Sequence, residues 1–87
     1  MNPSTLLIVD DERTLARSIK LFMAEQGYEA EVAENADKAL DLLDRLRPDL
    51  VFLDVCLPGT SGIELLRKIK EFDRNIAVII MTAYGSI

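Results

Sequence analysis

Four side chains in this sequence have the types and positions needed to act together on one substrate. Each follows a short apolar run typical of a buried strand: Asp10 and Asp11 follow Leu6–Val9, Asp54 follows Leu50–Leu53, and Thr82 follows Ile76–Met81. The carboxyl ends of parallel strands meet at one edge of a sheet, where open α/β sheets bind ligands, so we expect these groups to converge. The chain has no histidine, so carboxylates must carry any chemistry.

Three clustered carboxylates predict a divalent metal ion and a phosphoryl group. Their charges repel one another, and a hard ion such as Mg²⁺, or Mn²⁺, relieves this because it prefers oxygen ligands and keeps several waters. The ion would neutralise phosphate oxygens, the Thr82 hydroxyl would donate a hydrogen bond to another, and a carboxylate would attack phosphorus. Asp54 is the best candidate nucleophile because it interrupts an otherwise apolar strand, whose packing fixes its position.

Each of these residues also has a simpler structural interpretation. Asp11 could be only the N-cap of the helix that follows, Asp54 a turn residue at a strand end, and Thr82 a β-branched strand residue. The joint pattern favours the chemical interpretation, because every polar residue falls at the same end of its strand. Cys56 is interpreted as a small, inert loop residue without a redox partner.

The elements that must position these side chains alternate between strands and helices. The three apolar runs are continuous, as expected of parallel strands covered on both faces, and Tyr28–Val32 alternates polar and apolar residues like a strand near a sheet edge. Segments with helical periodicity fill the three intervals. The order β-α-β-α-β-α-β with right-handed crossovers predicts a doubly wound parallel α/β sheet.

Local signals delimit the three helices and predict which residues face the sheet. The first helix ends at Gly27, the second is capped by Asn35 and ended by Pro48, and the third opens with the capping box Ser61 and Glu64. The apolar residues expected to face inward are Leu15, Ile19, Phe22 and Met23 in the first helix, Ala36, Ala39, Leu40, Leu43 and Leu46 in the second, and Ile63, Leu66 and Ile69 in the third.

Composition indicates one small globular domain over residues 1–87. Hydrophobic residues make up 49% and charged residues 29% of the chain, enough for one modest core. The net charge of −5 argues against binding to nucleic acid or to an anionic membrane surface. A single cysteine, Cys56, allows no intrachain disulfide. This fits a reducing compartment. The N-terminus lacks a charged leader followed by an apolar stretch, and no apolar run approaches 18 residues. We therefore expect a cytoplasmic protein with neither an export leader nor a membrane span.

Three segments resemble the motifs of response-regulator receiver domains from bacterial two-component systems. They are Leu6–Glu12 (LLIVDDE), Leu53–Gly59 (LDVCLPG) and Met81–Gly85 (MTAYG), and their order and spacing also fit the family. The resemblance covers the whole chain and implies a flavodoxin-like fold with strand order 2-1-3-4 for the strands present. The last segment is similar to receivers of enhancer-binding transcriptional regulators.

The resemblance implies a role for each acidic residue. Asp54 would be the phosphorylated aspartate. Asp11 would be a direct ligand of Mg²⁺ and Asp10 a second, partly water-mediated one, joined by Asp54 and by the backbone carbonyl of Cys56. Such a domain is expected to be a regulatory phosphoacceptor in a Mg²⁺-dependent reaction, not an enzyme, and to switch an output.

The resemblance also implies switch residues and a phosphoryl donor. Thr82 would be the hydroxyl residue that turns toward the phosphoryl group, and Cys56 and Tyr84 would tune the rates of phosphorylation and dephosphorylation. The donor would be a phosphohistidine on a partner sensor histidine kinase, or a small phosphodonor such as acetyl phosphate.

Family members continue beyond the position of Ile87 through a further helix, a fifth strand and a last helix. The fifth strand ends in a lysine that pairs with the phosphoryl group, and no lysine in this sequence takes that role. We therefore expect an incomplete, C-terminally truncated receiver, with Ile76–Met81 as an exposed, uncharged edge that self-associates. The alternative function is a phosphorylation-incompetent receiver fragment that acts as a dimerisation or interaction module.

Two other functional classes fit less well. A phosphatase with an aspartyl nucleophile would need a second carboxylate two residues after it, where Cys56 stands. A nucleotide-binding fold would need a glycine-rich first turn, where Asp10–Glu12 is acidic, and Gly59–Gly62 lacks the lysine of a P-loop.

Overall fold

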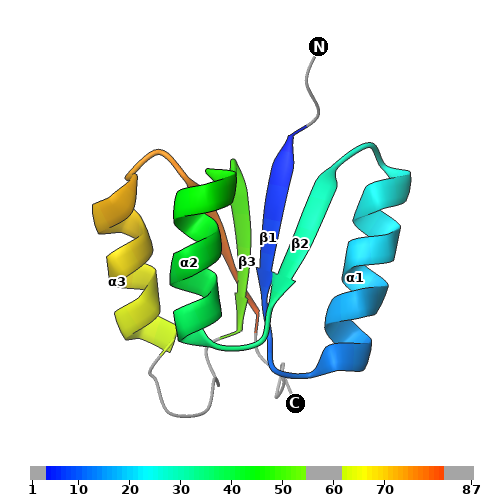
Figure 1. Cartoon of the computed structure of the whole chain (residues 1–87), viewed down its shortest axis with the longest axis horizontal. Coiled ribbons are helices and arrows are strands. Elements are labelled where there is room, and N and C mark those ends of the chain that lie inside the picture. Colours follow the sequence, from blue (N-terminus) through cyan, green and yellow to red (C-terminus); the bar gives the residue numbers. More distant parts are fainter. Residues whose placement is uncertain (1–3, 55–61, 82–87) are drawn as a thin grey trace.

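The computed structural model describes residues 4–54 and 62–81 of the chain. Seven elements alternate in the predicted order (Figure 1): β1 (Thr5–Val9), α1 (Arg13–Glu25), β2 (Glu29–Ala33), α2 (Ala36–Leu46), β3 (Leu50–Asp54), α3 (Gly62–Phe72) and β4 (Ala77–Met81). Three predicted site residues, Cys56, Thr82 and Tyr84, and the predicted cap Ser61 lie outside the described residues. Among the described helices, none is long and apolar enough to cross a bilayer.

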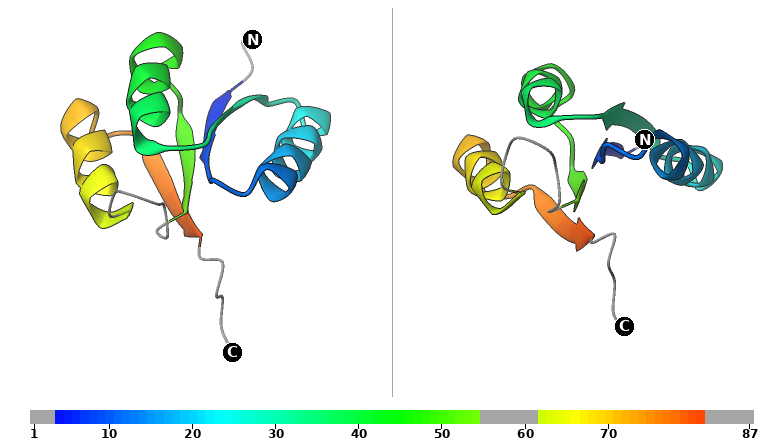
Figure 2. Two further views of the ribbon diagram at one scale, coloured as in Figure 1. Left: turned by 60° about the horizontal axis from the view of Figure 1, so that its bottom comes forward. Right: turned by 90° about the horizontal axis from the view of Figure 1, so that it is seen from below.

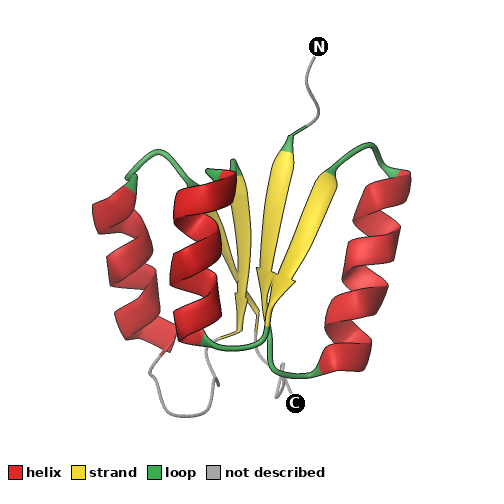
Figure 3. Ribbon diagram, viewed as in Figure 1, coloured by secondary structure: helices red, strands yellow, loops and turns green. Residues whose placement is uncertain are grey.

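The four strands form one parallel sheet in the order β2-β1-β3-β4. This confirms the predicted doubly wound topology and the strand order 2-1-3-4. The register pairs Val9 of β1 with Ala33 of β2 and with Leu53 of β3. The carboxyl ends of these three strands therefore lie level with one another, at the lower edge of the sheet in Figure 3.

Helices cover both faces of the sheet, which explains why its inner strands are apolar throughout. Figure 2 shows α2 and α3 on one face and α1 on the other. The α2/α3 side encloses the larger core, which includes Leu7, Leu43, Leu53, Leu65 and Ile69. The α1 side encloses a smaller core built from Leu6, Ile8, Ala16 and Ala30. Side chains of β1 thus alternate between the two cores, and both sets are fully buried.

The ends of α1 and α2 form as their local sequences predict. Gly27 adopts φ 96°, its N–H donates to Ala24 O at 3.1 Å, and the Tyr28 N–H donates to Met23 O at 3.1 Å. These two bonds are a Schellman motif, in which a left-handed residue, usually glycine, satisfies the last carbonyls of a helix. At the start of α2, Asn35 Oδ1 accepts the Lys38 N–H at 2.8 Å, confirming the predicted cap.

Two predicted helix faces are partly wrong. In α1, Ile19 and Met23 pack on the core as expected, but Phe22 is 59% exposed and Leu15 is also exposed. The small residue Ala16 is buried against the sheet instead. In α3, Leu65 is buried and Ile63 is 63% exposed. The rest of each predicted face is confirmed, since Ile19 and Met23 in α1 and Leu66 and Ile69 in α3 pack on the cores. Sequence periodicity places the apolar face of a helix but does not fix which residues at its margins turn inward.

The two edge strands of the described sheet differ in character. β2 carries the exposed carboxylates Glu29 and Glu31, and charge on an edge discourages pairing with another chain. β4 has no charged residue, and its Ile79 and Ile80 are 49% and 45% exposed. This confirms that the sequence places an apolar, uncharged strand at the edge of the described sheet.

Candidate functional site

Three carboxylates meet at the carboxyl edge of the sheet. Asp10 directly follows β1, Asp11 is the next residue, and Asp54 is the last residue of β3. One oxygen from each of the three lies within 4.8 Å of the others. Because β1 and β3 are adjacent and in register up to Val9 and Leu53, the convergence follows from the strand pairing itself.

Burial and hydrogen bonding fix Asp10 more firmly than Asp11. Asp10 and Asp54 are each only 4% exposed, whereas Asp11 is exposed. The Asp10 N–H donates to Ala33 O at 3.0 Å, and its Oδ1 accepts the Glu12 N–H at 2.9 Å. The second bond is an Asx turn, in which an aspartate side chain accepts from the backbone two residues on. Asp10 is therefore held from both its backbone and its side chain.

Sequence reasoning did not anticipate this positioning role of the Glu12 backbone. The signal that could have shown it is the placement of Asp10 directly between a strand and a helix, where Asx turns are common. The structure also corrects the simpler interpretation of Asp11. The N-cap position of α1 is occupied by Glu12, without a side-chain capping bond, so Asp11 is not the cap of this helix.

The electrostatics of the cluster disfavour a fully charged state. Burial raises the pKa of Asp10 above its ordinary value of 3.8, and the charges of Asp54 and Asp11, with a hydrogen bond to the Asp54 carboxyl, raise it further. The hydrogen bond from Glu12 acts in the opposite direction but does not cancel these effects. Crowded carboxylates of this kind are stabilised when a cation shares them.

The donor set fits a hard divalent cation. Ligand oxygens that share one octahedral Mg²⁺ lie roughly 3 to 4 Å apart, given bonds of about 2.0 to 2.1 Å, and the 4.8 Å span of the three aspartate oxygens needs little closure to reach this. All three donors are carboxylate oxygens, which Mg²⁺ and Mn²⁺ prefer. One of them, on Asp11, is exposed and can face solvent or an incoming ligand.

The structure thus brings together the three described residues that the sequence assigned to the site, and they come from two adjacent strands. The other assigned residues, Cys56, Thr82 and Tyr84, lie outside the described residues, and their roles stay predictions. Fold and site together define an open α/β protein with an acidic ligand site at the carboxyl edge of its sheet.

Comparison with known proteins narrows this class to one family. The chain belongs to the response regulator receiver domain family, whose model matches residues 6–87. These are the regulatory receiver domains of response regulators in two-component systems, and membership is consistent with phosphoryl acceptance.

The chain is similar to curated and structurally characterised receivers. It is 45% identical over 82 residues to sporulation initiation phosphotransferase F of Bacillus subtilis, covering 94% of this chain and 66% of that protein. It is 45% identical over 83 residues to the phosphate regulon transcriptional regulatory protein PhoB of Pseudomonas aeruginosa, covering 93% of this chain and 36% of that protein. The chain therefore spans about two thirds of the first relative and about a third of the second.

Two solved structures share the fold closely. A CheY-like receiver domain protein from Methanospirillum hungatei superposes with a TM-score of 0.90 at 32% identity, covering 98% of this chain and 68% of that one. The response regulator TrrA from Thermotoga maritima, solved in complex with Mg²⁺ and BeF, superposes with a TM-score of 0.86 at 36% identity, covering 94% of this chain and 71% of that one.

Proposed function

We propose that this domain accepts a phosphoryl group on Asp54 from a sensor histidine kinase, in a Mg²⁺-dependent reaction. The observation that carries the proposal is the convergence of three carboxylate oxygens within 4.8 Å at the carboxyl edge of the sheet. Membership of the receiver family supports it.

Asp54 is proposed as the nucleophile because the other two carboxylates suit different tasks. Asp10 is held by the Glu12 N–H, so its orientation is fixed and one oxygen is engaged. Asp11 is exposed and bonded into no strand, so it is suited to bind an ion at the rim. Asp54 ends β3, which pairs on both sides and is anchored by the buried residues Val51 and Leu53. This rigid position would hold the Asp54 carboxylate in a fixed orientation for attack on phosphorus.

The proposed step exchanges one bond at phosphorus for another. An Asp54 carboxylate oxygen forms a bond to phosphorus while the P–N bond to the donor imidazole breaks, and the imidazole nitrogen keeps the bonding electron pair. When bound, the divalent ion offsets the negative charge of the phosphoryl oxygens and of the three carboxylates. Asp10 and Asp11 would hold that ion in their ionised forms, together with Asp54 and the backbone carbonyl of Cys56.

We assign three further roles within this proposal to residues outside the described part. The Thr82 hydroxyl would donate a hydrogen bond to the phosphoryl group and act as the switch. Cys56 and Tyr84 would tune the rates of phosphorylation and dephosphorylation. The two curated relatives differ in their named functions but share this matched segment, which supports a role in phosphoryl acceptance and not in one particular output.

Titration with beryllofluoride, a non-covalent phosphoryl mimic, tests the site. In the presence of Mg²⁺ we expect saturable shifts of the amide resonances of residues 9–12 and 53–54 in the wild type. These shifts should be absent in Asp54→Asn and strongly weakened in Asp11→Asn, while the exposed control Glu71→Gln behaves as wild type. Equal shifts in Asp54→Asn and wild type would refute the assignment of Asp54.

A second proposal concerns the edge of the described sheet. We propose that two copies of the chain associate by antiparallel pairing of β4, because this strand is uncharged and exposes Ile79 and Ile80, whereas the β2 edge carries Glu29 and Glu31. Pairing an uncharged strand with itself places no like charges opposite one another, although the whole chain carries a net charge of −5.

Sedimentation velocity tests the second proposal. We expect a concentration-dependent dimer for the wild type and a monomer for Ile79→Lys, which places a charge in the centre of the edge. The matched control is Ile63→Lys, which adds the same charge at an exposed apolar position on α3. A wild type that stays monomeric at high concentration, or a dimer that survives Ile79→Lys, would contradict edge pairing.

A further inference from the structure

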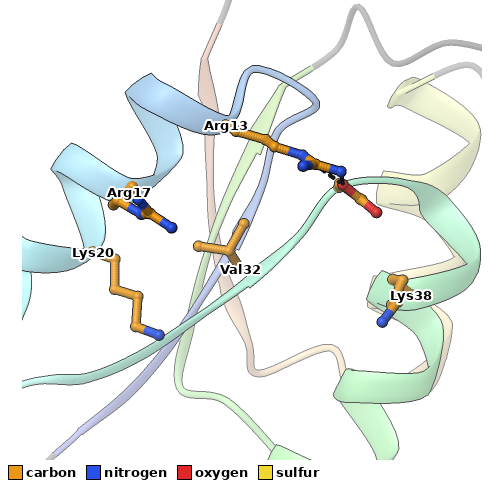
Figure 4. A pocket seen from close by; sticks show the side chains of 6 residues that line it. Arg13, Arg17, Lys20, Val32 and Lys38 are labelled. Atoms are coloured by element: carbon orange, nitrogen blue, oxygen red, sulfur yellow. Dashed lines mark hydrogen bonds and ion pairs between the residues drawn. The ribbon is translucent and has the colours of Figure 1, made fainter.

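A basic pocket lies beside β2 and borders the acidic site at the carboxyl edge of the sheet. Arg13 is two residues from Asp11, and Glu34 follows Ala33, whose carbonyl accepts the Asp10 N–H. Its lining comes from three elements and the segment between them: Arg13, Arg17 and Lys20 from α1, Val32 from β2, Glu34, and Lys38 from α2. Figure 4 shows Arg17 and Lys20 extending from α1 toward Val32, with Lys38 on the side of α2. The pocket has a volume of about 280 Å³.

The charge of this pocket is opposite to that of the chain. Among the described residues, the lining holds four of the ten basic residues of the chain and one acidic residue, a net charge of +3, whereas the whole chain carries −5. Basic side chains spaced at positions 13, 17 and 20 share one face of a helix, so their convergence on β2 is built into α1. Concentration of positive charge in a concave site favours binding of anions.

Only part of this positive charge is neutralised within the protein. Arg13 pairs with Glu34 at 3.1 Å, and Lys20 approaches Glu31 at 3.6 Å. Within residues 4–54 and 62–81, the side chains of Arg17 and Lys38 make no hydrogen bond or ion pair. Two cations from different helices therefore border the same pocket without a partner among the described residues.

We infer that this pocket binds a compound with two linked phosphoryl groups. Arg17 and Lys38 lie on different helices and have no partner among the described residues, so a diphosphate can offer one phosphoryl group to each, whereas a single phosphate cannot. A phosphate monoester carries about −1.5 to −2 charge at pH 7. Arg17 offers a planar fork suited to phosphate oxygens and Lys38 a compact point charge. A volume of about 280 Å³ lies near the lower end of small-ligand sites, which suits a diphosphate group with little else enclosed.

Inorganic pyrophosphate in metal-free buffer with EDTA is the probe that tests this inference. Without metal the acidic site repels anions, so binding there does not contribute. We expect saturable binding by calorimetry, with amide shifts concentrated at residues 13–20 and 32–38. Arg17→Gln and Lys38→Gln should each weaken binding roughly fivefold or more, as loss of a charge-assisted hydrogen bond implies. Asp54→Asn should bind as wild type does.

Two further variants distinguish binding of pyrophosphate in this pocket from non-specific electrostatic attraction to the protein surface. Lys68→Gln removes one charge from an exposed position on α3 and should leave pyrophosphate affinity within about twofold, because it lies outside the pocket. Glu34→Gln removes the negative charge that pairs with Arg13 and should tighten binding. ADP distinguishes the source of the diphosphate: affinity equal to pyrophosphate indicates phosphate recognition alone, and tighter binding indicates a nucleotide.

Several results would overturn the inference. These are the absence of saturable pyrophosphate binding, weakening by Lys68→Gln as large as that by Arg17→Gln, or weaker binding by Glu34→Gln. None of them bears on phosphorylation of Asp54, whose test uses beryllofluoride and Mg²⁺.

Discussion

At the scale of single residues, the acidic site places a buried carboxylate and an exposed carboxylate at adjacent positions of the chain. Asp10 is buried and held by the Glu12 N–H at 2.9 Å, and Asp11 is exposed. The buried residue provides a fixed position and the exposed one provides access from solvent. The proposed function, which needs an ion bound reversibly and a phosphoryl group admitted, would use both properties. The cost of burying Asp10 is reflected in its raised pKa.

The raised pKa of Asp10 predicts a pH-dependent stability of the metal-free domain. The folded state holds the Asp10 proton more tightly than the unfolded state, where the pKa is near 3.8. This contribution to stability is therefore present below pH 3.8 and is lost as pH rises through the higher folded pKa. Urea unfolding of Asp10→Asn should show a smaller decrease in stability over this range than wild type. Glu71→Gln is the control, and equal slopes for Asp10→Asn and wild type would contradict the electrostatic account.

Binding of Mg²⁺ should offset the unfavourable burial and mutual repulsion of the three carboxylates. At a free Mg²⁺ concentration 100 times its dissociation constant, ion binding to the folded state should add about 2.7 kcal/mol to the free energy of unfolding. Asp11→Asn should reduce the gain strongly, because it removes one of the three carboxylate donors. Urea unfolding with and without Mg²⁺ provides the measurement, and a gain that is unchanged in Asp11→Asn would place the ion elsewhere.

At the scale of elements, the junction between β2 and α2 depends on one side-chain hydrogen bond. Asn35 Oδ1 accepts the Lys38 N–H at 2.8 Å, and loss of such a cap costs about 1 kcal/mol. Asn35→Ala should lower the free energy of unfolding by about that amount, whereas Asn35→Asp should retain most of it. Equal destabilisation by both variants would show that the hydrogen bond is not the cause.

The sequence predicted the strands and their ends better than the helix faces. Continuous runs such as Leu6–Val9 identify buried parallel strands directly, and Asp10 and Asp54 mark where those strands reach the edge of the sheet. Phe22 and Ile63 were misplaced because sequence periodicity does not fix which residues at the margins of an apolar helix face turn inward.

The basic pocket lay beyond sequence reasoning for a different reason. Arg13, Arg17 and Lys20 show a helical spacing that could have indicated a basic face. The position of Lys38 relative to them depends on how α1 and α2 flank β2, which only the assembled fold determines. Surface charges scattered over three elements carry no local motif of the kind that marks Asp10 and Asp11.

At the scale of the whole molecule, the chain separates its charges and its apolar surface by location. The acidic cluster lies at the carboxyl edge of the sheet, the basic pocket beside β2, and the uncharged edge at β4.

Edge pairing predicts a stability that depends on protein concentration. Because association involves only the folded state, mass action raises the melting temperature as the concentration of chain increases. We expect this rise in wild type and its loss in Ile79→Lys, measured by calorimetry over a wide concentration range. A melting temperature independent of concentration in the wild type would contradict self-association through β4.

The most direct test of the central claim is the intact mass of the protein after incubation with acetyl phosphate and Mg²⁺, with tryptic mapping of the modified residue. We expect a gain of one phosphoryl group, located on Asp54, that is absent in Asp54→Asn and in the presence of EDTA. A gain of the same size in Asp54→Asn, or no gain in the wild type under conditions that phosphorylate a receiver domain of full family length, would contradict it.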